Sequence, residues 1–375
     1  MSRIGSIGSA LYAGEVSYDF VGRRKIWYAI SGAIVAVAVI ALLVRGLNLS
    51  IDFKGGSEFA LPQGSGTIAQ AQAVTRAENL PNAVVTTARS ASGSTIRVEV
   101  QNLTAQGNAT LAGALAKSFG VPPSEVSVQV IGPSWGSAIT SKAEEGLVIF
   151  LIFIVAFLSV YFEWRMAVAA LVAVLHDVVI TIGVYALFGF VVSPATVIGV
   201  LTILGYSLYD TVVVFDKVKE NTRGLLAGSK MTYSEAANLA VNQTLVRSIN
   251  TSVIALLPVA SILFIGPLLG ADTLKDLSLA LFVGIAAGTY SSIFVATPVL
   301  AQLKERQQEY KALAKRVALR RASAAKGAES PVAALAGAAA GGGTATAVAG
   351  PAIEVRPASG TQRAQPKKTQ GKRRR

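Results

Sequence analysis

The sequence predicts a polytopic α-helical membrane protein with six transmembrane helices and one small α+β domain outside the membrane. The 375-residue chain has a mean hydropathy of +0.53 and only 15% charged residues, whereas soluble domains average about 25%. Its apolar residues also gather in long runs. At 1.5 Å per helical residue, runs of this length can cross a hydrocarbon core of about 30 Å.

The six expected spans are separated by glycine, proline or charged residues. Basic residues 23–25 precede the first span, which we interpret as an uncleaved signal anchor because secretory apolar segments are only about 7–15 residues long. The uncharged stretch 178–209 is too long for one crossing, and Gly189 with Ser193-Pro194 divides it. The spans are expected at 26–44, 146–161, 166–188, 194–215, 248–265 and 277–300.

The distribution of Lys and Arg predicts the orientation. Basic residues concentrate in the N-terminal segment 1–25, at Arg165, in loop 217–246 and in the tail, all on one side if there are six spans. Short basic connections stay in the cytoplasm. Both termini are therefore expected there, with residues 45–143 outside and the remaining five spans in 144–303.

Residues 45–143 have the pattern of a small ferredoxin-like domain. Alternating apolar residues predict strands, and residues 109–119 place Leu111, Leu115 and Phe119 on one helix face. The resulting order, β-α-β-β-α-β, is that of a split βαβ unit. The strands are expected at 51–61, 83–89, 95–101 and 126–130, and the helices at 67–80 and 109–119.

The net charge of +13 belongs to the C-terminal tail. Residues 302–375 contain 16 Lys and Arg against 4 Asp and Glu, a net of +12, which leaves +1 for the other 301 residues. The tail, 304–375, is expected to be largely disordered because it contains few large apolar residues from about residue 322 onward. Its basic clusters could bind anionic lipids or ribosomal RNA, or could simply be solvated.

Several chemistries are excluded by composition. There is no cysteine and only one histidine, His176, which excludes disulfides, thiolate catalysis and Cys-rich or His-rich metal sites. No phosphate-binding loop or nucleophile–base–acid set can be assembled from the remaining residues. We therefore expect neither an enzyme nor a protein with a metal or organic cofactor.

Asp210 is the first candidate functional residue because it ends the uncharged run 178–209. A charge inside a membrane costs about 2.5–3.5 kcal/mol on insertion scales, so a retained acid is paired or functional. Tyr206 shares its helix face, one turn earlier. The alternative is an acid that reaches water at the interface, a description that fits Asp216 better.

Arg247, at the start of the fifth span, is the predicted counter-ion of Asp210. With Gln243, Asn250 and Thr251 it forms a polar stripe at i, i+4, i+7 and i+8. A stripe of this kind that enters an apolar span faces protein or water. The alternative is a positively charged anchor at the cytoplasmic interface.

Two further sets of candidate residues, one polar and one small, lie inside the predicted spans. His176 and Asp177 lie near the middle of the third span, where they could form a proton path or a structural polar contact. In the sixth span Gly284, Gly288 and Ser292 recur every four residues, the small-xxx-small pattern that lets two helices pack closely.

Four motifs follow one another along the chain. The first follows the first span and contains Asp52, Gly55 and Gly56. The other three are residues 205–221, 242–252 and 291–298. Together they resemble the SecF family, the smaller membrane subunit of the bacterial SecDF complex within the RND superfamily, and the resemblance covers about residues 20–303.

The resemblance implies a fold, a place in the cell and partners. The six spans would form half of an RND-type bundle in the bacterial cytoplasmic membrane, and SecD would supply the other half. Further implied partners are the SecYEG channel with SecA, the proteins YajC and YidC, and unfolded preproteins. Protons would be the coupling ion, with Asp210 and Arg247 matching the family's intramembrane acid and arginine.

Two other functions stay open at this point. One is half of an RND-type exporter of small molecules or lipids. The other is a translocon scaffold without proton coupling, in which the charges are purely structural.

Overall fold

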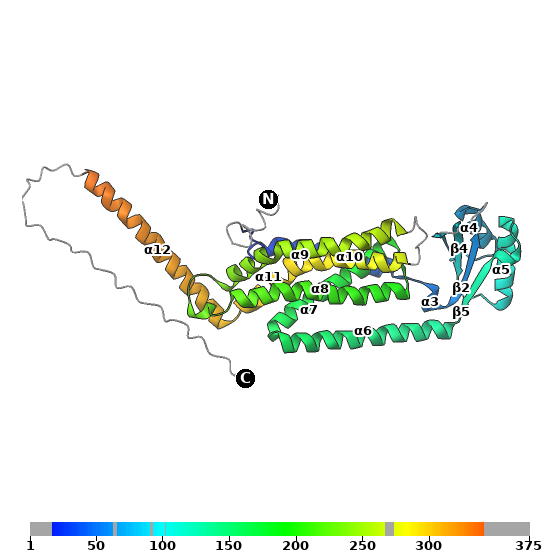
Figure 1. Cartoon of the computed structure of the whole chain (residues 1–375), viewed down its shortest axis with the longest axis horizontal. Coiled ribbons are helices and arrows are strands. Elements are labelled where there is room, and N and C mark those ends of the chain that lie inside the picture. The colour runs from blue at the N-terminus through cyan, green and yellow to red at the C-terminus, as the bar shows by residue number, and fades with distance from the viewer. Residues whose placement is uncertain (1–16, 63–65, 91–92, 102, 267–273, 341–375) are drawn as a thin grey trace, which may run out of the picture. The chain divides into compact units, whose positions relative to one another are not determined.

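The computed structural model describes residues 17–62, 66–90, 93–101, 103–266 and 274–340. Within these residues, six helical segments are long and apolar enough to cross a membrane, which confirms the predicted class (Figure 1). The sixth span contains a π-helical segment, η5 (Ser292–Ala296), between α10 (Lys275–Ser291) and α11 (Thr297–Glu305). The other spans are α2 (Arg24–Arg45), α6 (Pro133–Tyr161), α7 (Trp164–Phe188), α8 (Pro194–Asn221) and α9 (Tyr233–Phe264).

Local sequence signals set the ends of these helices. Gly189, in the left-handed conformation at φ 69°, ends α7, and Ser193 starts α8 with a capping box. Thr232 caps α9 in the same way, so this helix begins well before the apolar run. Beside Gly189, the two-residue strands β1 (Asn48–Leu49) and β6 (Val191–Val192) pair in parallel.

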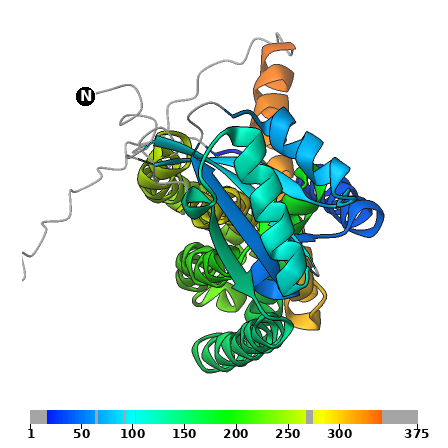
Figure 2. The same ribbon diagram turned by 90° about the vertical axis from the view of Figure 1, so that its right-hand side faces the viewer.

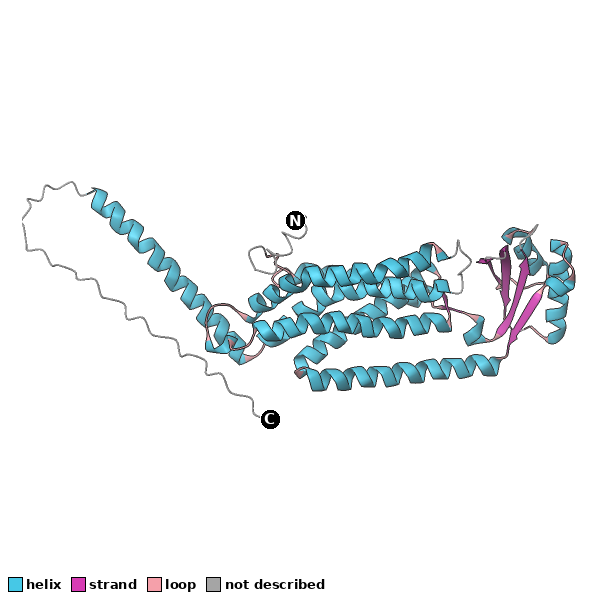
Figure 3. Cartoon of the chain, viewed as in Figure 1, coloured by secondary structure: helices cyan, strands magenta, loops and turns pink. Residues whose placement is uncertain are grey.

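The ferredoxin-like domain is confirmed. Its four-stranded antiparallel sheet has the order β3-β4-β2-β5, and Figures 2 and 3 show α4 and α5 on one face of that sheet. Phe59, Leu115 and Phe119 belong to the core between the helices and the sheet. The elements are β2 (Gly56–Pro62), α4 (Ile68–Ala77), β3 (Val84–Ser90), β4 (Gly93–Val100), α5 (Ala105–Phe119), η1 (Pro123–Glu125) and β5 (Ser127–Ile131).

The strand predicted at 51–61 starts later than expected. Residues Ile51–Lys54 form one helical turn, α3, and β2 begins at Gly56. The short alternation at 51–54 fits a helical turn as well as a strand, because Ile51 is buried in either case. Gly55 and Gly56 make the reversal, with φ values of 75° and 152°.

Gly56 is the more constrained of the two glycines. A Cβ at this position would lie 2.6 Å from the carbonyl oxygen of Val100 in β4. Only glycine adopts such a φ readily.

We expect Gly56→Ala to destabilise the domain by about 2 kcal/mol or more, measured as protease resistance of the full chain during heating. Gly113→Ala on α5, where a Cβ meets open space, is the control and should not destabilise. Equal stability of the two variants would contradict this explanation of the glycine pair.

Two carboxylates lie directly opposite each other on β2 and β4. Glu58 pairs in register with Glu99, and Arg97 lies 3.3 Å from Glu58. Burial, followed by the negative charges of Glu58 and Asp52, raises the pKa of Glu99 from 4.5 to about 7. Folded Glu99 therefore keeps its proton at a pH where unfolded Glu99 has lost it. The resulting stabilisation is complete below pH 4.5 and is lost as the pH rises to about 7.

This titration predicts how Glu99→Gln behaves. The variant should be more stable than the parent at pH 8 by about 1 kcal/mol, a value kept small because the carboxyl is partly exposed to solvent. Its stability should also change less between pH 5 and pH 8, as followed by thermal unfolding of the domain in the full chain. Glu125→Gln, an exposed glutamate of the same domain, is the control. An unchanged pH dependence in Glu99→Gln would refute the assignment.

The tail differs from the expectation of disorder. Helix α12 (Gln308–Ala340) occupies its first part. Alanine is the strongest helix former, and Leu313 and Val317, one turn apart, are buried. The chain divides into two units after Arg321. The basic clusters at 367–368 and 372–375, and Pro267 after the fifth span, lie outside the described residues.

Candidate functional site: two buried aspartates held by serines

The predicted acids are buried where four spans meet. Asp177 of α7 is 1% exposed and Asp210 of α8 is 4% exposed. Figure 1 shows α10 lying along both α8 and α9, and α10 also contacts α7. Two carboxylates are thus enclosed by apolar helices, where each needs partners to be tolerated.

Asp210 is held by serines from two other helices. Ser248 of α9 donates to its Oδ1 at 2.7 Å, and Ser292 of η5 donates to its Oδ2. Both serines are fully buried. Hydrogen bonds to a charged group contribute about 1.5–3 kcal/mol each. Two of them offset the cost of about 2.5–3.5 kcal/mol for an intramembrane acid.

Asp177 has a similar set of partners. Ser207 of α8 and Ser291 of α10 both donate to its Oδ2, at 2.5 and 2.7 Å. His176 Nδ1 lies 3.1 Å from Oδ1, so the adjacent residues do touch, although their positions on the helix did not require it. The His176 ring stacks on Tyr290, and its buried Nε2 has no partner among the described residues.

Ser291 and Ser292 connect the two acids. They are consecutive residues, and they lie where α10 changes into the π-helical segment η5. π-helical segments are rare and often mark functional sites. One short piece of the sixth span therefore holds both carboxylates, and a shift of that piece changes the surroundings of both.

The predicted ion pair between Asp210 and Arg247 is absent from this structure. Arg247 is exposed, and its Nη2 donates to the Tyr209 hydroxyl at 3.3 Å. Successive residues on a helix point about 100° apart. Ser248 takes the inward position facing Asp210, so Arg247 points elsewhere. The contact of Arg247 with Tyr209 and the contact of Ser248 with Asp210 therefore lie next to each other between α8 and α9.

The predicted polar stripe on α9 is divided. Gln243 accepts a hydrogen bond from Asn221 at 2.9 Å and lines a pocket of about 540 Å³ together with Arg247 and Asp216. Asn250 is exposed, and the Thr251 hydroxyl donates to backbone carbonyls of its own helix. Tyr206, on α8, is partly buried. Of the stripe, only Gln243 and Arg247 line this pocket.

The small residues of the sixth span have two roles. Gly284 lies against Ile203, and Gly288 lies against Ser207, where an added Cβ would come within 2.8 Å of the Ser207 Cβ. Ser292, predicted from its four-residue spacing to be a packing residue, donates to Asp210. The close contact at Gly288 positions Ser207, which in turn holds Asp177.

Sequence reasoning missed Ser207, Ser248 and Ser291 as site residues. The signal that could have found them is the need of a buried carboxylate for donors. Hydroxyl residues inside apolar runs near an acid are the first donors to consider. Among the described residues, no group of three or more His, Cys, Asp or Glu side chains could hold a metal ion.

Comparison with known proteins identifies the family. Residues 112–306 match the family model described as the C-terminal part of the protein export membrane proteins SecD/SecF, and residues 40–62 match the SecD/SecF GG motif. The chain is 50% identical over 330 residues to the protein translocase subunit SecF of Streptomyces coelicolor, with 87% of this chain and 88% of that protein covered. The chain belongs to the SecF family of protein translocase subunits.

Other SecF and SecDF proteins agree with this assignment. The SecF of Mycobacterium tuberculosis H37Rv is 46% identical over 325 residues, which cover 84% of this chain and 73% of that protein. The crystal structure of SecDF from Thermus thermophilus aligns with a TM-score of 0.68 at 29% identity. This alignment covers 82% of the chain and 40% of the SecDF chain. The GG motif of the family model contains Gly55 and Gly56, the pair that turns the chain into β2.

Proposed function

We propose that this SecF-family subunit uses proton flow to promote export of unfolded preproteins, with Asp210 as a proton-binding group. The observation that carries this proposal is the burial of Asp177 and Asp210 in apolar helices, each held by hydroxyls from two other helices. Such an arrangement can accommodate a carboxylate or a carboxylic acid, because a serine hydroxyl can donate or accept. Protons are the only coupling ion that the proposal requires, and it involves no other cofactor.

Protonation of Asp210 would change the contacts between three helices. As a carboxylate it accepts from both Ser248 and Ser292. Once protonated, it becomes a donor at one oxygen, so one serine must turn and the helix packing changes. A proton crossing 100 mV releases about 2.3 kcal/mol, which is enough to shift a two-state equilibrium by more than tenfold.

The remaining pathway residues fit the same scheme. His176 and Asp177 would relay a proton to Asp210 through the adjacent hydroxyls of Ser291 and Ser292. Arg247 would act at the cytoplasmic end, where it lines the polar pocket that contains Asp216. Its positive charge at this pocket would favour release of the proton from Asp210 towards the cytoplasm.

The bundle is connected directly to the ferredoxin-like domain. α2 leads through α3 into β2, and α6 follows β5 after Gly132. α3 also packs on α6, where a Cβ on Gly136 would lie 2.5 Å from the carbonyl oxygen of Phe53. A change in helix packing could therefore be passed to the domain, which would lie outside the cytoplasm.

The proposal places the chain in the bacterial cytoplasmic membrane with both termini in the cytoplasm. Arg24, at the start of the first span, pairs with Glu305 at the end of the sixth at 2.9 Å, so these two ends lie on the same side. We propose a separate SecD as partner, because the aligned part of SecDF is 40% of that chain. SecYEG with SecA, YajC, YidC and unfolded preproteins complete the proposed set of partners.

A charge-neutral pair of substitutions separates proton coupling from a scaffold role. Asp210→Asn combined with Arg247→Gln removes one charge of each sign. If the charges are purely structural, the double variant keeps its function. We expect it to lose gradient-driven export, at least tenfold, in vesicles that contain SecD, SecYEG and SecA. Export at the parent rate would overturn the proposal, and a defect in association with SecD would be detected by co-purification.

A further inference from the structure

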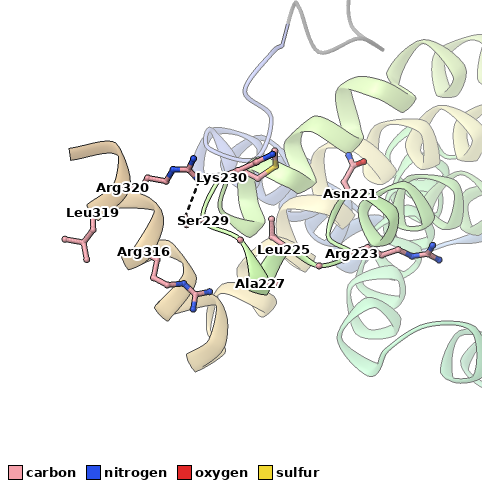
Figure 4. Close-up of a pocket in the computed structure, with 12 residues that line it drawn as sticks. Asn221, Arg223, Leu225, Ala227, Ser229, Lys230, Arg316, Leu319 and Arg320 are labelled. Carbon is pink, nitrogen blue, oxygen red and sulfur yellow. Dashed lines mark hydrogen bonds between the residues drawn. The ribbon is translucent and has the colours of Figure 1, made fainter. Parts of the chain in front are cut away.

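A basic pocket lies between the loop that follows α8 and the first turns of α12 (Figure 4). It has a volume of about 870 Å³, and the short helix η2 (Leu225–Ala227) forms part of its wall. The pocket is remote in sequence from Asp177. It does not include Arg247 or any of the four serines that hold Asp177 and Asp210. The proposed export function makes no use of it.

The lining residues include four cations, Arg223, Lys230, Arg316 and Arg320, and no carboxylate. Arg316 and Arg320 are one turn apart on α12, a spacing at which like charges repel. Figure 4 shows their heads turned from α12 towards the loop of Ser229 and Lys230. Arg316 donates to the carbonyl oxygen of Leu226 at 2.7 Å, a bond that positions the guanidinium without neutralising it.

A neighbouring arginine shows the contrast. Arg321 does not line the pocket, and it forms a two-bond pair with Glu235 at 2.7 and 2.9 Å. The charge of Arg321, which lies outside the pocket, is thus paired with a carboxylate of the same chain. Lys230 and Arg316 present positive charge to the pocket that an external anion would match, and arginine heads suit phosphate oxygens in particular.

The pocket also has an apolar part. Leu225, Met231 and Leu319 line it beside the cations. The Leu319 side chain is 71% exposed, an unfavourable position for a leucine in water. A ligand that carries both a phosphate and an apolar portion would use both parts of the lining, whereas a free inorganic ion would use only one.

The depth of the pocket favours a lipid. Asn221, at one edge, comes six residues after Phe215, where the apolar run of the span ends. Six residues of helix rise about 9 Å. The head-group region extends about 5–8 Å beyond each side of the hydrocarbon core. The edge of the pocket at Asn221 therefore lies at the outer limit of the head-group region, about one helical residue beyond it.

From these observations we infer that the pocket binds the phosphate group of an anionic phospholipid, with Lys230 and Arg316 as its main cationic contacts. The apolar residues of the lining contact the glycerol and the start of the acyl chains. This site is formed by described residues of the bundle end and α12, separate from the basic clusters at the end of the tail.

Native mass spectrometry of the full chain tests the inference. The chain is released from phosphatidylcholine nanodiscs that contain phosphatidylglycerol, and retained lipid is counted. Lys230→Gln with Arg316→Gln should lower the affinity for phosphatidylglycerol about thirtyfold, from about 1 kcal/mol per cation and 1.4 kcal/mol per factor of ten. The matched control, Arg306→Gln with Lys315→Gln, removes the same charges from exposed positions outside the pocket.

The outcomes are distinct. A loss confined to the pocket variant supports the inference, whereas equal losses in both variants would show a general surface charge effect and overturn it. A second arm adds inorganic phosphate or glycerol phosphate to chains in pure phosphatidylcholine. Binding of these soluble anions as tightly as the lipid would assign the pocket to a soluble ligand and overturn the lipid assignment. Since all four substituted side chains are exposed, a folding defect is not expected.

Discussion

Asp210→Asn is expected to reduce gradient-driven export to the level seen without a proton gradient, a loss of at least tenfold, while association with SecD is kept. Asparagine has nearly the size of aspartate and can still accept from one serine through its oxygen. Its amide group can donate to the other serine, because a hydroxyl can turn to accept. The variant therefore resembles protonated Asp210, with contacts to both serines kept, and it can neither take up nor release a proton.

The matched control for this variant is Asp216→Asn, on the same helix. Asp216 is exposed and lines the same pocket as Gln243 and Arg247, so its charge is solvated. We expect this variant to export at a rate within about threefold of the parent, since exposed charges contribute little. Export should be measured in vesicles with SecD, SecYEG and SecA, with and without a proton gradient. Parent-like, gradient-dependent export by Asp210→Asn would exclude Asp210 as the coupling acid.

Asp177→Asn should have the second largest effect, a loss of gradient-driven export of about tenfold. Ser207 and Ser291 both donate to one oxygen of Asp177, so an asparagine oxygen at that place keeps both bonds. The amide nitrogen would then face His176 Nδ1, which fixes that nitrogen as an acceptor. The packing is kept, and the exchange of a proton between His176 and Asp177 is lost.

The comparison variant is Ser159→Ala on α6. The Ser159 hydroxyl bonds a backbone carbonyl of its own helix and is exposed, so its loss should leave export unchanged. Thermal unfolding of each variant in nanodiscs separates a coupling defect from a loss of stability. If Asp177→Asn is as stable as the parent and exports normally, His176 and Asp177 are a structural contact only.

Much of the fold follows from the sequence because its signals are local. Apolar runs long enough to cross a bilayer, the left-handed Gly189 and the capping box at Thr232 each specify an element without reference to the rest of the chain. Helix α12 was not predicted, because the burial of Leu313 and Val317 depends on the tertiary structure and cannot be read from the local sequence.

The acids of the site were predictable, but their partners were not. A charge in an apolar run is visible in the sequence. Arg247 and Ser248 are adjacent on α9 and point about 100° apart. The rotation of α9 about its axis therefore decides which of them faces Asp210, and both choices are chemically reasonable. The same holds for Ser291 and Ser292, whose adjacent hydroxyls reach different acids only because the sixth span packs against both α7 and α8.

Proton entry into vesicles is the most direct measure of whether Asp210 carries the coupling proton. Vesicles containing the chain with SecD, SecYEG and SecA, and a pH-sensitive dye inside, would be followed while a preprotein is exported under an imposed gradient. We expect proton entry linked to export with the parent and with Asp216→Asn, and none with Asp210→Asn. Equal proton entry in the parent and in Asp210→Asn would contradict it.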